Sequence, residues 1–451
     1  MKMKKYLVAA SALALCGAAT VLSSCGGNNT AKVEYVDAEG KTQTVEVKAT
    51  EDSTEVSKAV YAYVQNQTSK NRAIPSELSL NVSEEVSVSG KTAKNSDLMN
   101  LISMLVNGPA RAEKVLAPLS LEGDGASMPA LTNPFSLSEK LTANVSVKIP
   151  TVTVDVKDKS AEEAQKEMAE KGKAFLKGIE ASANVNVETK IPDVAAFVNA
   201  MSTEGADIDA VSLEGKKEMK ATIQAYLKDL NAVVKTSGNL EASYFQTIPY
   251  VSEYGDLIGE LLGTTGKELK FDFGTNFAQP IDRVAASVGA VFANLNAANA
   301  QTSELAPTVV SMEQITEFVT SNKVAITKVD GTNVTIKLTG APSAVNASSL
   351  DGLEVVTSGE STTKLSDMVF ELTVNVANLN YAKLNISMGD FLTSYVKSIP
   401  AASTFVADFN AKVDATVEIT DKANIQALTA SDKAVDGFQY ISTLPFFNKV
   451  K

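Results

Sequence analysis

The chain has 451 residues, a net charge of −12, two cysteines, and neither histidine nor tryptophan. This length corresponds to two or three domain equivalents of about 150 residues each. The 44% hydrophobic and 21% charged fractions are typical of a globular protein. The lack of histidine excludes Ser-His-Asp and Cys-His nucleophile systems and histidine-ligated metal sites. The negative charge, with only three arginines, disfavours nucleic acid as a partner.

The first residues predict a signal peptide. Lys2, Lys4 and Lys5 precede an apolar run over residues 6–21, which is too short and too rich in Ala and Ser for a transmembrane helix. Leu22-Ser23-Ser24-Cys25 follows, and this tetrapeptide resembles the lipobox of bacterial lipoproteins. The resemblance implies that residues 1–24 are removed and that Cys25 becomes an acylated N-terminus, carrying palmitate or a similar chain. The alternative is an ordinary secretory signal with a chance cysteine.

The start of the mature chain also resembles lipoproteins of the Bacteroidota, which implies a cell-envelope location. Acidic residues just after the lipidated cysteine resemble a surface-export signal in that group, and none occurs here before Glu34. Gly26 rather than Asp follows Cys25, which by analogy with enterobacterial sorting favours the outer membrane. The expected orientation faces the periplasm, and surface exposure is the alternative.

Composition divides the remaining chain into three parts. Residues 25–31 form a short tether, whose flexible part reaches only about 12 Å from the anchor. The stretch Asn296–Pro307, rich in Ala, Asn, Gln and Ser, is the best linker candidate. We therefore predict an N-terminal α+β region at 32–300 and a C-terminal α+β region at 301–451, with the alternative that the two share one continuous sheet.

The mature chain opens with a predicted hairpin and helix. Alternating apolar residues flank a turn at 37–40, which predicts a hairpin over Lys32–Lys48. Asp52 then precedes an apolar stripe at helical spacing, Val56 to Val64, and is placed to cap that helix. Asp52-Ser53-Thr54 also resembles a short O-glycosylation sequon of the Bacteroidota, which is the alternative interpretation.

Long runs of alternating apolar and polar residues predict the main strands. They cover residues 78–88, 141–149, 179–191 and 405–419, with a parity shift after Pro150 to the apolar residues 152–156. Half-polar alternation favours antiparallel strands. The predicted fold is therefore α+β, with long antiparallel strands in one or two curved sheets and amphipathic helices packed on a face. In 405–419 we expect buried odd positions and exposed even ones, so that Val413→Asp costs several kcal/mol.

Helical spacing and capping residues predict the remaining elements. A hairpin is also expected over Lys323–Thr339, turning at Asp330-Gly331. The expected helices cover 96–107, 160–178 (Ser160/Glu163 capping box), 219–234, 281–295, 311–321 (Ser311/Gln314 capping box) and 390–398.

The acidic residues nominate no catalytic pair. Glu84 and Glu85 would point to opposite faces of a strand, and Glu162 and Glu163 suit the first turn of a helix. Asp207-Ile208-Asp209 has the alternate spacing of a calcium loop without its Gly and terminal Glu. We predict a non-catalytic protein with no cofactor and no metal.

Two functions are consistent with these sequence features. In the first, the strands and helices enclose an apolar cavity for a lipid-like ligand, lined by Ala407, Ala411, Val413 and Ala415, whose small or branched side chains leave room. In the second, the protein is a structural or assembly lipoprotein that acts through contacts with an envelope protein partner. Either way, N-terminal acyl chains connect it to the membrane.

Overall fold

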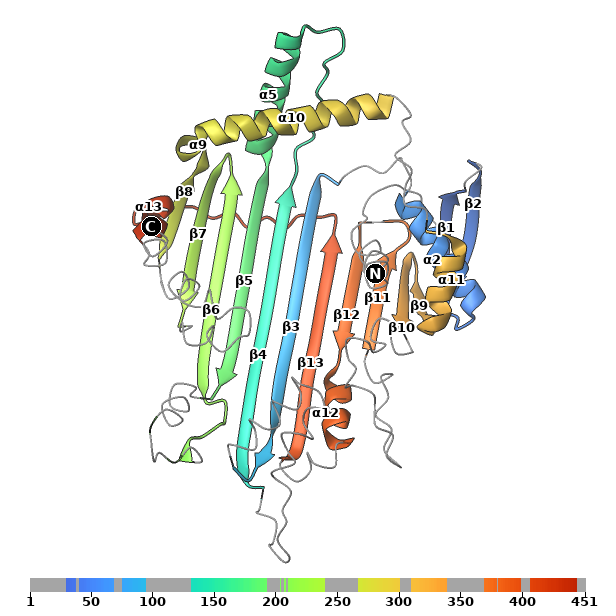
Figure 1. Ribbon diagram of the computed structural model, residues 1–451, viewed down its shortest axis with the longest axis vertical. Coiled ribbons are helices and arrows are strands. Elements are labelled where there is room, and N and C mark those ends of the chain that lie inside the picture. The colour runs from blue at the N-terminus through green and yellow to red at the C-terminus, as the bar shows by residue number, and fades with distance from the viewer. Residues whose placement is uncertain are drawn as a thin grey trace, which may run out of the picture.

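The computed structural model describes residues 30–37, 40–68, 75–94, 131–192, 203, 207, 210–239, 267–300, 310–338, 369–378, 380–398 and 406–443. The fold is mixed α+β and consists mostly of strands in one large antiparallel sheet, which does not close into a barrel (Figure 1). The twelve strands lie in the order β14-β8-β7-β6-β5-β4-β3-β13-β12-β11-β10-β9, and β1 and β2 form a separate hairpin. Antiparallel strands were predicted, and the sheet confirms them.

The strands alternate in direction along the sheet, except for the short parallel pair β14 and β8. Their bounds are β1 Thr30–Val36, β2 Thr42–Lys48, β3 Glu77–Thr92, β4 Asn133–Lys148, β5 Glu180–Ile191, β6 Lys217–Lys228, β7 Asn231–Gly238, β8 Glu268–Asp272, β9 Val324–Asp330, β10 Asn333–Leu338, β11 Val369–Asn375, β12 Ala382–Ser387, β13 Val406–Thr420 and β14 Val435–Asp436.

The predicted helices at 160–178, 281–295, 311–321 and 390–398 are present, whereas 96–107 lies outside the described residues. The capping boxes at Ser160 and Ser311 both form. The helices are α2 Ser53–Thr68, α5 Ala161–Gly178, α9 Phe273–Asn276, α10 Ala278–Ala300, α11 Met312–Ser321, α12 Gly389–Ser398 and α13 Gly437–Thr443.

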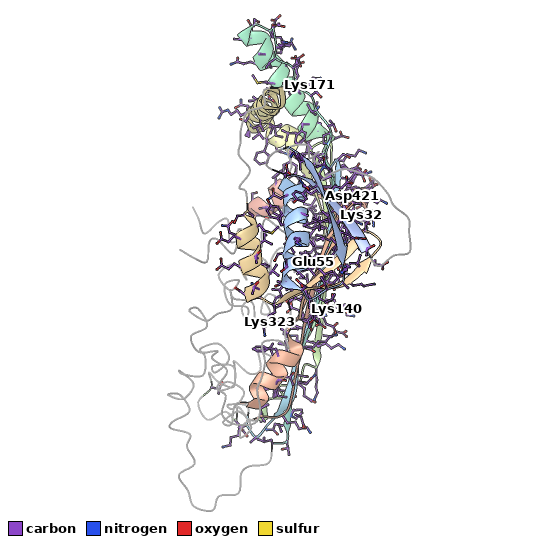
Figure 2. The ribbon with its side chains drawn as sticks, turned by 90° about the vertical axis from the view of Figure 1, so that its right-hand side faces the viewer. Lys32, Glu55, Lys140, Lys171, Lys323 and Asp421 are labelled. Carbon is purple, nitrogen blue, oxygen red and sulfur yellow. The ribbon has the colours of Figure 1, made fainter. Side chains whose placement is uncertain are left out.

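The central strands are longer than the alternating pattern required. β3 and β4 each have 16 residues and pair along their full length, which corresponds to about 50 Å at ~3.3 Å per residue. Seen edge-on, these strands form a thin layer that includes Lys140, while Lys171 of α5 lies beyond one end of the sheet (Figure 2). The strand predicted at 152–156 is absent, because β4 ends at Lys148 and residues 149–156 are irregular.

Residues 219–234 form a hairpin and not the predicted helix. Apolar residues at 219, 221, 223, 225 and 227 already alternate, and β6 follows this period of two. Asp229 and Leu230 then adopt left-handed backbone conformations, with φ of 50° and 62°, and reverse the chain into β7. Two consecutive residues with positive φ are typical of the tight turn that matches strand twist. The apolar residues of β7 made the whole stretch resemble a helical stripe.

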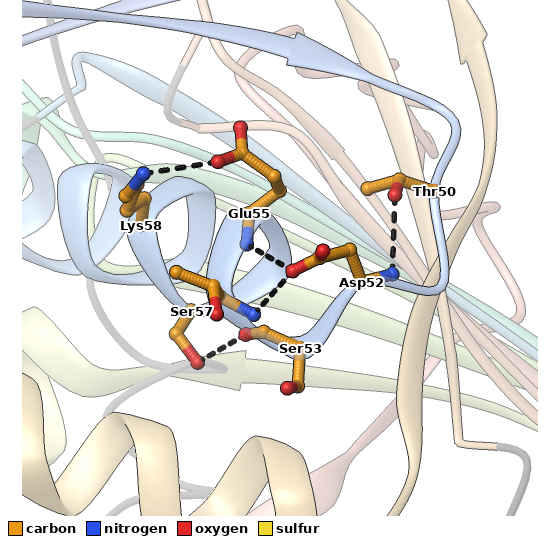
Figure 3. A network of polar contacts seen from close by, with 7 residues as sticks. Thr50, Asp52, Ser53, Glu55, Ser57 and Lys58 are labelled. Carbon is orange, nitrogen blue, oxygen red and sulfur yellow. Dashed lines mark hydrogen bonds and ion pairs between the residues drawn. The ribbon is translucent and has the colours of Figure 1, made fainter.

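The N-terminal hairpin and helix form as expected. The Asp52 carboxylate accepts hydrogen bonds from the backbone N–H groups of Thr54 at 2.8 Å and Glu55 at 3.2 Å (Figure 3). These bonds hold the pKa of Asp52 below its ordinary value. The side chain of Glu55 forms an ion pair with Lys58, with 2.9 Å between Oε1 and Nζ. Asp52 therefore acts as the N-cap of α2.

The main apolar core joins this N-terminal unit to the edge of the large sheet. The predicted stripe of α2 is fully inside it, with Val56 at 0% exposure. Side chains of β1, β2 and α11 surround α2, and those of β9, β10 and β11 complete the cluster. Thr50 also forms an antiparallel bridge with Ile326 of β9. The N-terminal hairpin therefore packs on strands that come about 280 residues later.

Helices α5 and α10 cross beyond the end of the strands (Figure 1). Gly172 and Gly289 allow this crossing, since a Cβ at Gly172 would lie 1.8 Å from the carbonyl oxygen of Ala285. A Cβ at Gly289 would lie 1.9 Å from the carbonyl oxygen of Met168. Lys173 and Asp282 form an ion pair across the same crossing, at 2.9 Å. The two helix backbones are thus in direct contact.

Candidate functional site: the apolar face of the central strands

The register of the large sheet aligns apolar side chains into ladders across the strands. Paired residues of antiparallel neighbours project from the same face, so each ladder lies on one face, which we call the apolar face. The longest ladder takes one residue from each of eleven strands, from β9 to β8: Val329, Val334, Val374, Ala382, Ile419, Leu80, Val145, Ala183, Ala225, Val234 and Leu269.

A second ladder runs beside the first. Its members are Ile326, Ile336, Leu372, Leu384, Val417, Val82, Ala143, Val185 and Ile223. In strands β3–β6 the charged residues at positions of this parity are Glu84, Glu139 and Lys217. The apolar face is therefore broad and carries few charges.

This face is covered at both ends of the first ladder and open in the middle. Val334 is 3% exposed beneath the N-terminal unit, and Leu269 near the opposite edge is 5% exposed. Leu80, in the central strand β3, is 38% exposed, and its neighbours Ile419 and Val145 are half-buried. Leu137 of β4 is 40% exposed on the same face. The candidate site is this open central part.

Three of the four predicted lining residues lie on the apolar face. Val413 pairs with Val86 and Ala415 pairs with Glu84, and both side chains are half-buried. Ala411 is buried where α12 contacts β13, and its backbone N–H donates to Oγ1 of Thr393 at 2.9 Å. Val413 and Ala415 thus border the open part, whereas Ala411 lies beneath a helix.

Ala407 lies on the opposite face, because β13 contains a bulge. Ala407 pairs with Lys91 and Asn410 with Ser89, so Asp408 and Phe409 stand opposite Gly90 alone and β13 carries one extra residue. Asp408 has a φ of 53°, in the left-handed region that Asp tolerates better than most residues, and pairs with Lys91 at 2.6 Å. The parity expected for 405–419 holds over 408–412, where Phe409 and Ala411 are buried and the even positions are exposed. It is wrong at Val406, which is buried, and residues 413–420 are half-buried on both faces. Phe405 lies outside the described residues. Because Val413 is half-exposed, Val413→Asp should cost less than several kcal/mol.

The interior of the core next to this face is closely packed. A space of about 10 Å³ lies between Val33, Tyr63 and Ile336, among other side chains of the N-terminal unit and β9–β11. Such a space is about what one water needs, and it is far smaller than an acyl chain. An apolar ligand at the candidate site would therefore lie on the open face.

The other face of the sheet is polar and carries a strap. The strap, residues 421–434, follows β13 and crosses β3, β4 and β5 (Figure 1). Backbone N–H groups of the strap donate to Ser146 at 3.2 Å and to Ser182 at 3.0 Å. Both serines are buried, with Ser146 at 0% exposure. The strap thus occupies part of the polar face and contacts none of the ladder residues of the apolar face through the hydrogen bonds of its described residues.

Ion pairs and tyrosine–carboxylate bonds satisfy other polar-face residues. Tyr226 donates its hydroxyl to Glu180 at 2.6 Å. Burial, together with this bond, raises the pKa of Tyr226 to about 12. The same hydrogen bond lowers the pKa of Glu180. The shift of Tyr226 thus arises from its burial and from the hydrogen bond to Glu180, and that bond is also the main cause of the shift of Glu180.

The far end of the strap depends on a carboxylate and therefore on pH. Glu268 accepts the backbone N–H of Ser431 at 2.5 Å and its hydroxyl at 2.9 Å, and these bonds lower the pKa of Glu268 below its ordinary 4.5. Because the folded-state pKa is the lower one, this stabilisation is present above pH 4.5 and is lost as the pH falls through the folded value.

We expect acidification below pH 4.5 to lower the Tm of the natural protein more than that of Glu268→Gln. The measurement is Tm against pH for both proteins, with Glu214→Gln as a control outside the strap contacts. Parallel curves for the natural protein and Glu268→Gln would show that Glu268 does not hold the strap through its charge.

A pocket of about 320 Å³ lies where α5 and α10 meet the β6–β7 turn, and its lining includes Asp229, Asp272 and Asp282. Asp272 accepts from the backbone N–H of Thr275 at 2.9 Å as the cap of α9, which lowers its pKa. Asp282 pairs with Lys173. These two carboxylates thus have structural partners already.

The structure places the neighbouring acidic residues of the sequence on opposite faces of the sheet or at the start of a helix. Glu85 pairs with Lys412 at 2.7 Å on the polar face, whereas Glu84 is on the apolar face. Glu162 and Glu163 lie in the first turn of α5. Asp207 is described but Asp209 is not. Among the described residues, no group of three or more potential ligands is arranged for a metal ion.

Comparison with known proteins identifies no relative. No family matches the chain, and neither the curated proteins nor the solved structures contain a match to it. Within the described part of the chain, no helix combines the length and apolarity needed to cross a membrane. Cys25 and the rest of the lipobox lie outside the described residues, so its acylation remains a prediction.

Proposed function

We propose that this protein is a lipid-anchored, non-catalytic protein of the bacterial envelope that binds an apolar or lipid-like ligand on the apolar face. The proposal combines the lipobox-like sequence at residues 22–25 with the open central ladders. The observation that carries it is the exposure of Leu80 and Leu137, at 38% and 40%, in the middle of a face with few charges.

The chemistry of this face favours acyl chains over polar ligands. Ala, Val, Leu and Ile line it, and burial of their surface contributes about 25 cal/mol per Å² without directional bonds. Strands of about 50 Å are longer than an extended acyl chain, so the face can accommodate the whole length of one. Binding on such a surface should be tolerant of chain length, since one methylene changes the affinity by only about 0.8 kcal/mol.

The proposal includes amphipathic helices that pack on the same face and bound the site. It is supported by the burial of Ala411 next to Thr393 of α12, and by the apolar cluster that joins α2 to β9–β11. In this proposal, strands and helices from both sides of residue 300 form the site together. The predicted boundary between the regions 32–300 and 301–451 then lies within one functional unit. The outer-membrane location, with the domain facing the periplasm, belongs to this proposal as well.

The alternative is a structural or assembly lipoprotein with no ligand. It is favoured by the openness of the face, because a broad surface of half-exposed apolar side chains also suits a protein partner. The two functions differ in what binds the same residues. A soluble acyl probe separates them directly.

Adjacent residues of β3 provide a matched test. Val82 projects from the apolar face and Ser83 from the polar face. We expect residues 25–451 with Cys25→Ala to bind a fluorescent fatty acid, Val82→Glu to weaken binding at least about tenfold by placing a charge against the chain, and Ser83→Glu to leave it unchanged. The measurement is displacement of the fluorescent probe by palmitate.

No binding by the unsubstituted protein would refute the ligand proposal and favour the structural alternative. Equal loss in both variants, with circular dichroism spectra unchanged, would place the ligand elsewhere on the molecule.

A further inference from the structure

Helix α10 carries an exposed apolar stripe that the proposed ligand site does not use. Phe277, just before the helix, is 40% exposed, Val284 is 50% exposed and Val291 is 55% exposed. Val284 and Val291 are seven positions apart and therefore lie on one side of the helix. Phe277 comes seven positions before Val284, and its ring packs against that of Phe438, with 5.0 Å between the centroids. Phe277, Val284 and Val291 account for three of the eight large apolar side chains that are exposed in the described part of the chain.

The spacing of this stripe is that of a helix–helix interface. Ile281 and Val288, both half-exposed, lie between the three exposed residues. The resulting intervals of four and three residues repeat along the helix, as in the two apolar positions of a coiled-coil heptad. We call these five residues the α10 seam.

Most of the seam is separate from the surface that contacts α5, and only Ile281 also borders the pocket that Lys173 and Lys177 of α5 line. The α5 crossing uses Ala285 and Gly289, and Asp282 pairs there with Lys173. At 100° per residue, these three positions are centred roughly 120° around the helix from the seam. A second helix can therefore lie on the seam while α5 keeps its present place.

The charges of α10 indicate what kind of helix docks on the seam. Asp282 and Arg283 are the only charged residues of α10, and residues 284–300 carry none. Charges beside the seam are what select a different partner or repel an identical one, and here they are lacking. A helix lying on a membrane surface would instead carry Lys and Arg opposite its apolar side.

We propose that a second copy of this chain docks its own α10 against the α10 seam, which forms a symmetric dimer. A self-complementary patch is what a two-fold interface requires, and an uncharged apolar seam meets that condition. The inference is independent of the ligand site, because the seam lies beyond the end of the strands that carry the apolar face (Figure 1).

Sedimentation velocity of residues 25–451 with Cys25→Ala tests this dimer, since that chain keeps every described residue. We expect a reversible monomer–dimer equilibrium between about 1 and 100 μM, a range typical of moderate affinity. Val284→Glu should weaken the dimer at least about tenfold, because it places a charge in the desolvated centre. Ala286→Glu, on the exposed opposite side of the same helix, should leave the equilibrium unchanged.

A monomer at every concentration would overturn the proposal, and so would a dimer that survives Val284→Glu or is lost equally with Ala286→Glu. If Val284→Glu does not fold, Val291→Glu is the replacement, and it is expected to weaken the dimer to the same extent. Unchanged ligand binding in a monomeric variant would show that the two sites are separate.

Discussion

Replacement of Cys25 by alanine should abolish acyl labelling and release the protein from the membrane. The thiol of Cys25 is the attachment point that the lipobox resemblance implies, and within the lipobox only Cys25 can form the thioether. Two or three acyl chains anchor a protein stably, whereas a single chain is marginal, so complete loss of the chains should change the protein from membrane-bound to soluble. Metabolic labelling with palmitate and fractionation of membranes measure both effects.

The other cysteine provides the matched control for this experiment. Cys16 lies in the apolar run before the predicted cleavage site, so Cys16→Ala should keep full labelling. Palmitate incorporation that persists in Cys25→Ala, or that disappears in Cys16→Ala, would contradict the lipobox assignment.

Val56→Asp should be among the most destabilising single substitutions in the described chain. Val56 is 0% exposed, in the middle of the cluster that joins α2, the β1–β2 hairpin and β9–β11. A carboxylate there would lose its hydration without a cationic partner in that cluster of apolar residues, at a cost of about 3–5 kcal/mol. Urea denaturation measures the change in the free energy of unfolding.

Thr54→Asp is the control on the same helix. Thr54 is exposed in the first turn of α2, where a carboxylate faces the positive end of the helix dipole. We expect it to stay within about 0.5 kcal/mol of the natural protein. A similar loss from both substitutions would mean that α2 does not pack in this core.

Local signals allowed the sequence to predict the elements that depend on neighbouring residues. The capping residues Ser160 and Ser311 each form hydrogen bonds with the third helical residue, so four consecutive residues determine where α5 and α11 begin. Strict alternation over ten or more residues likewise has one physical explanation, a strand with two different faces. The turn at Gly331 is also marked locally, because its φ of 60° is a backbone conformation that glycine adopts readily.

Sequence patterns that fit two different structures led to wrong predictions. The apolar residues of β6 and β7 fit both a period of two and a helical stripe, and only the left-handed Asp229-Leu230 turn decides between them. The bulge at Asp408 was also missed, because nothing in the alternating pattern marks where pairing with β3 slips. As a result Ala407 was assigned to the wrong face.

The candidate site depends on pairings that are distant in sequence. β13 lies beside β3, so Val417 meets Val82 across more than 300 residues of chain. The apolar parity of each strand could be read from the sequence, but their order in the sheet could not. Leu80, Val145 and Val185 were therefore recognised as strand residues without being placed in one surface.

Photo-crosslinking with a fatty acid that carries a diazirine near its methyl end tests the apolar face most directly. Residues 25–451 with Cys25→Ala would be irradiated with this probe, and the adducts would be mapped by mass spectrometry. We predict adducts on the even-numbered residues from 78 to 88 of β3 and on the odd-numbered residues from 141 to 147 of β4, which project from the apolar face. Adducts confined to the residues of opposite parity, or none above those of a diazirine reagent without an acyl chain, would contradict the account.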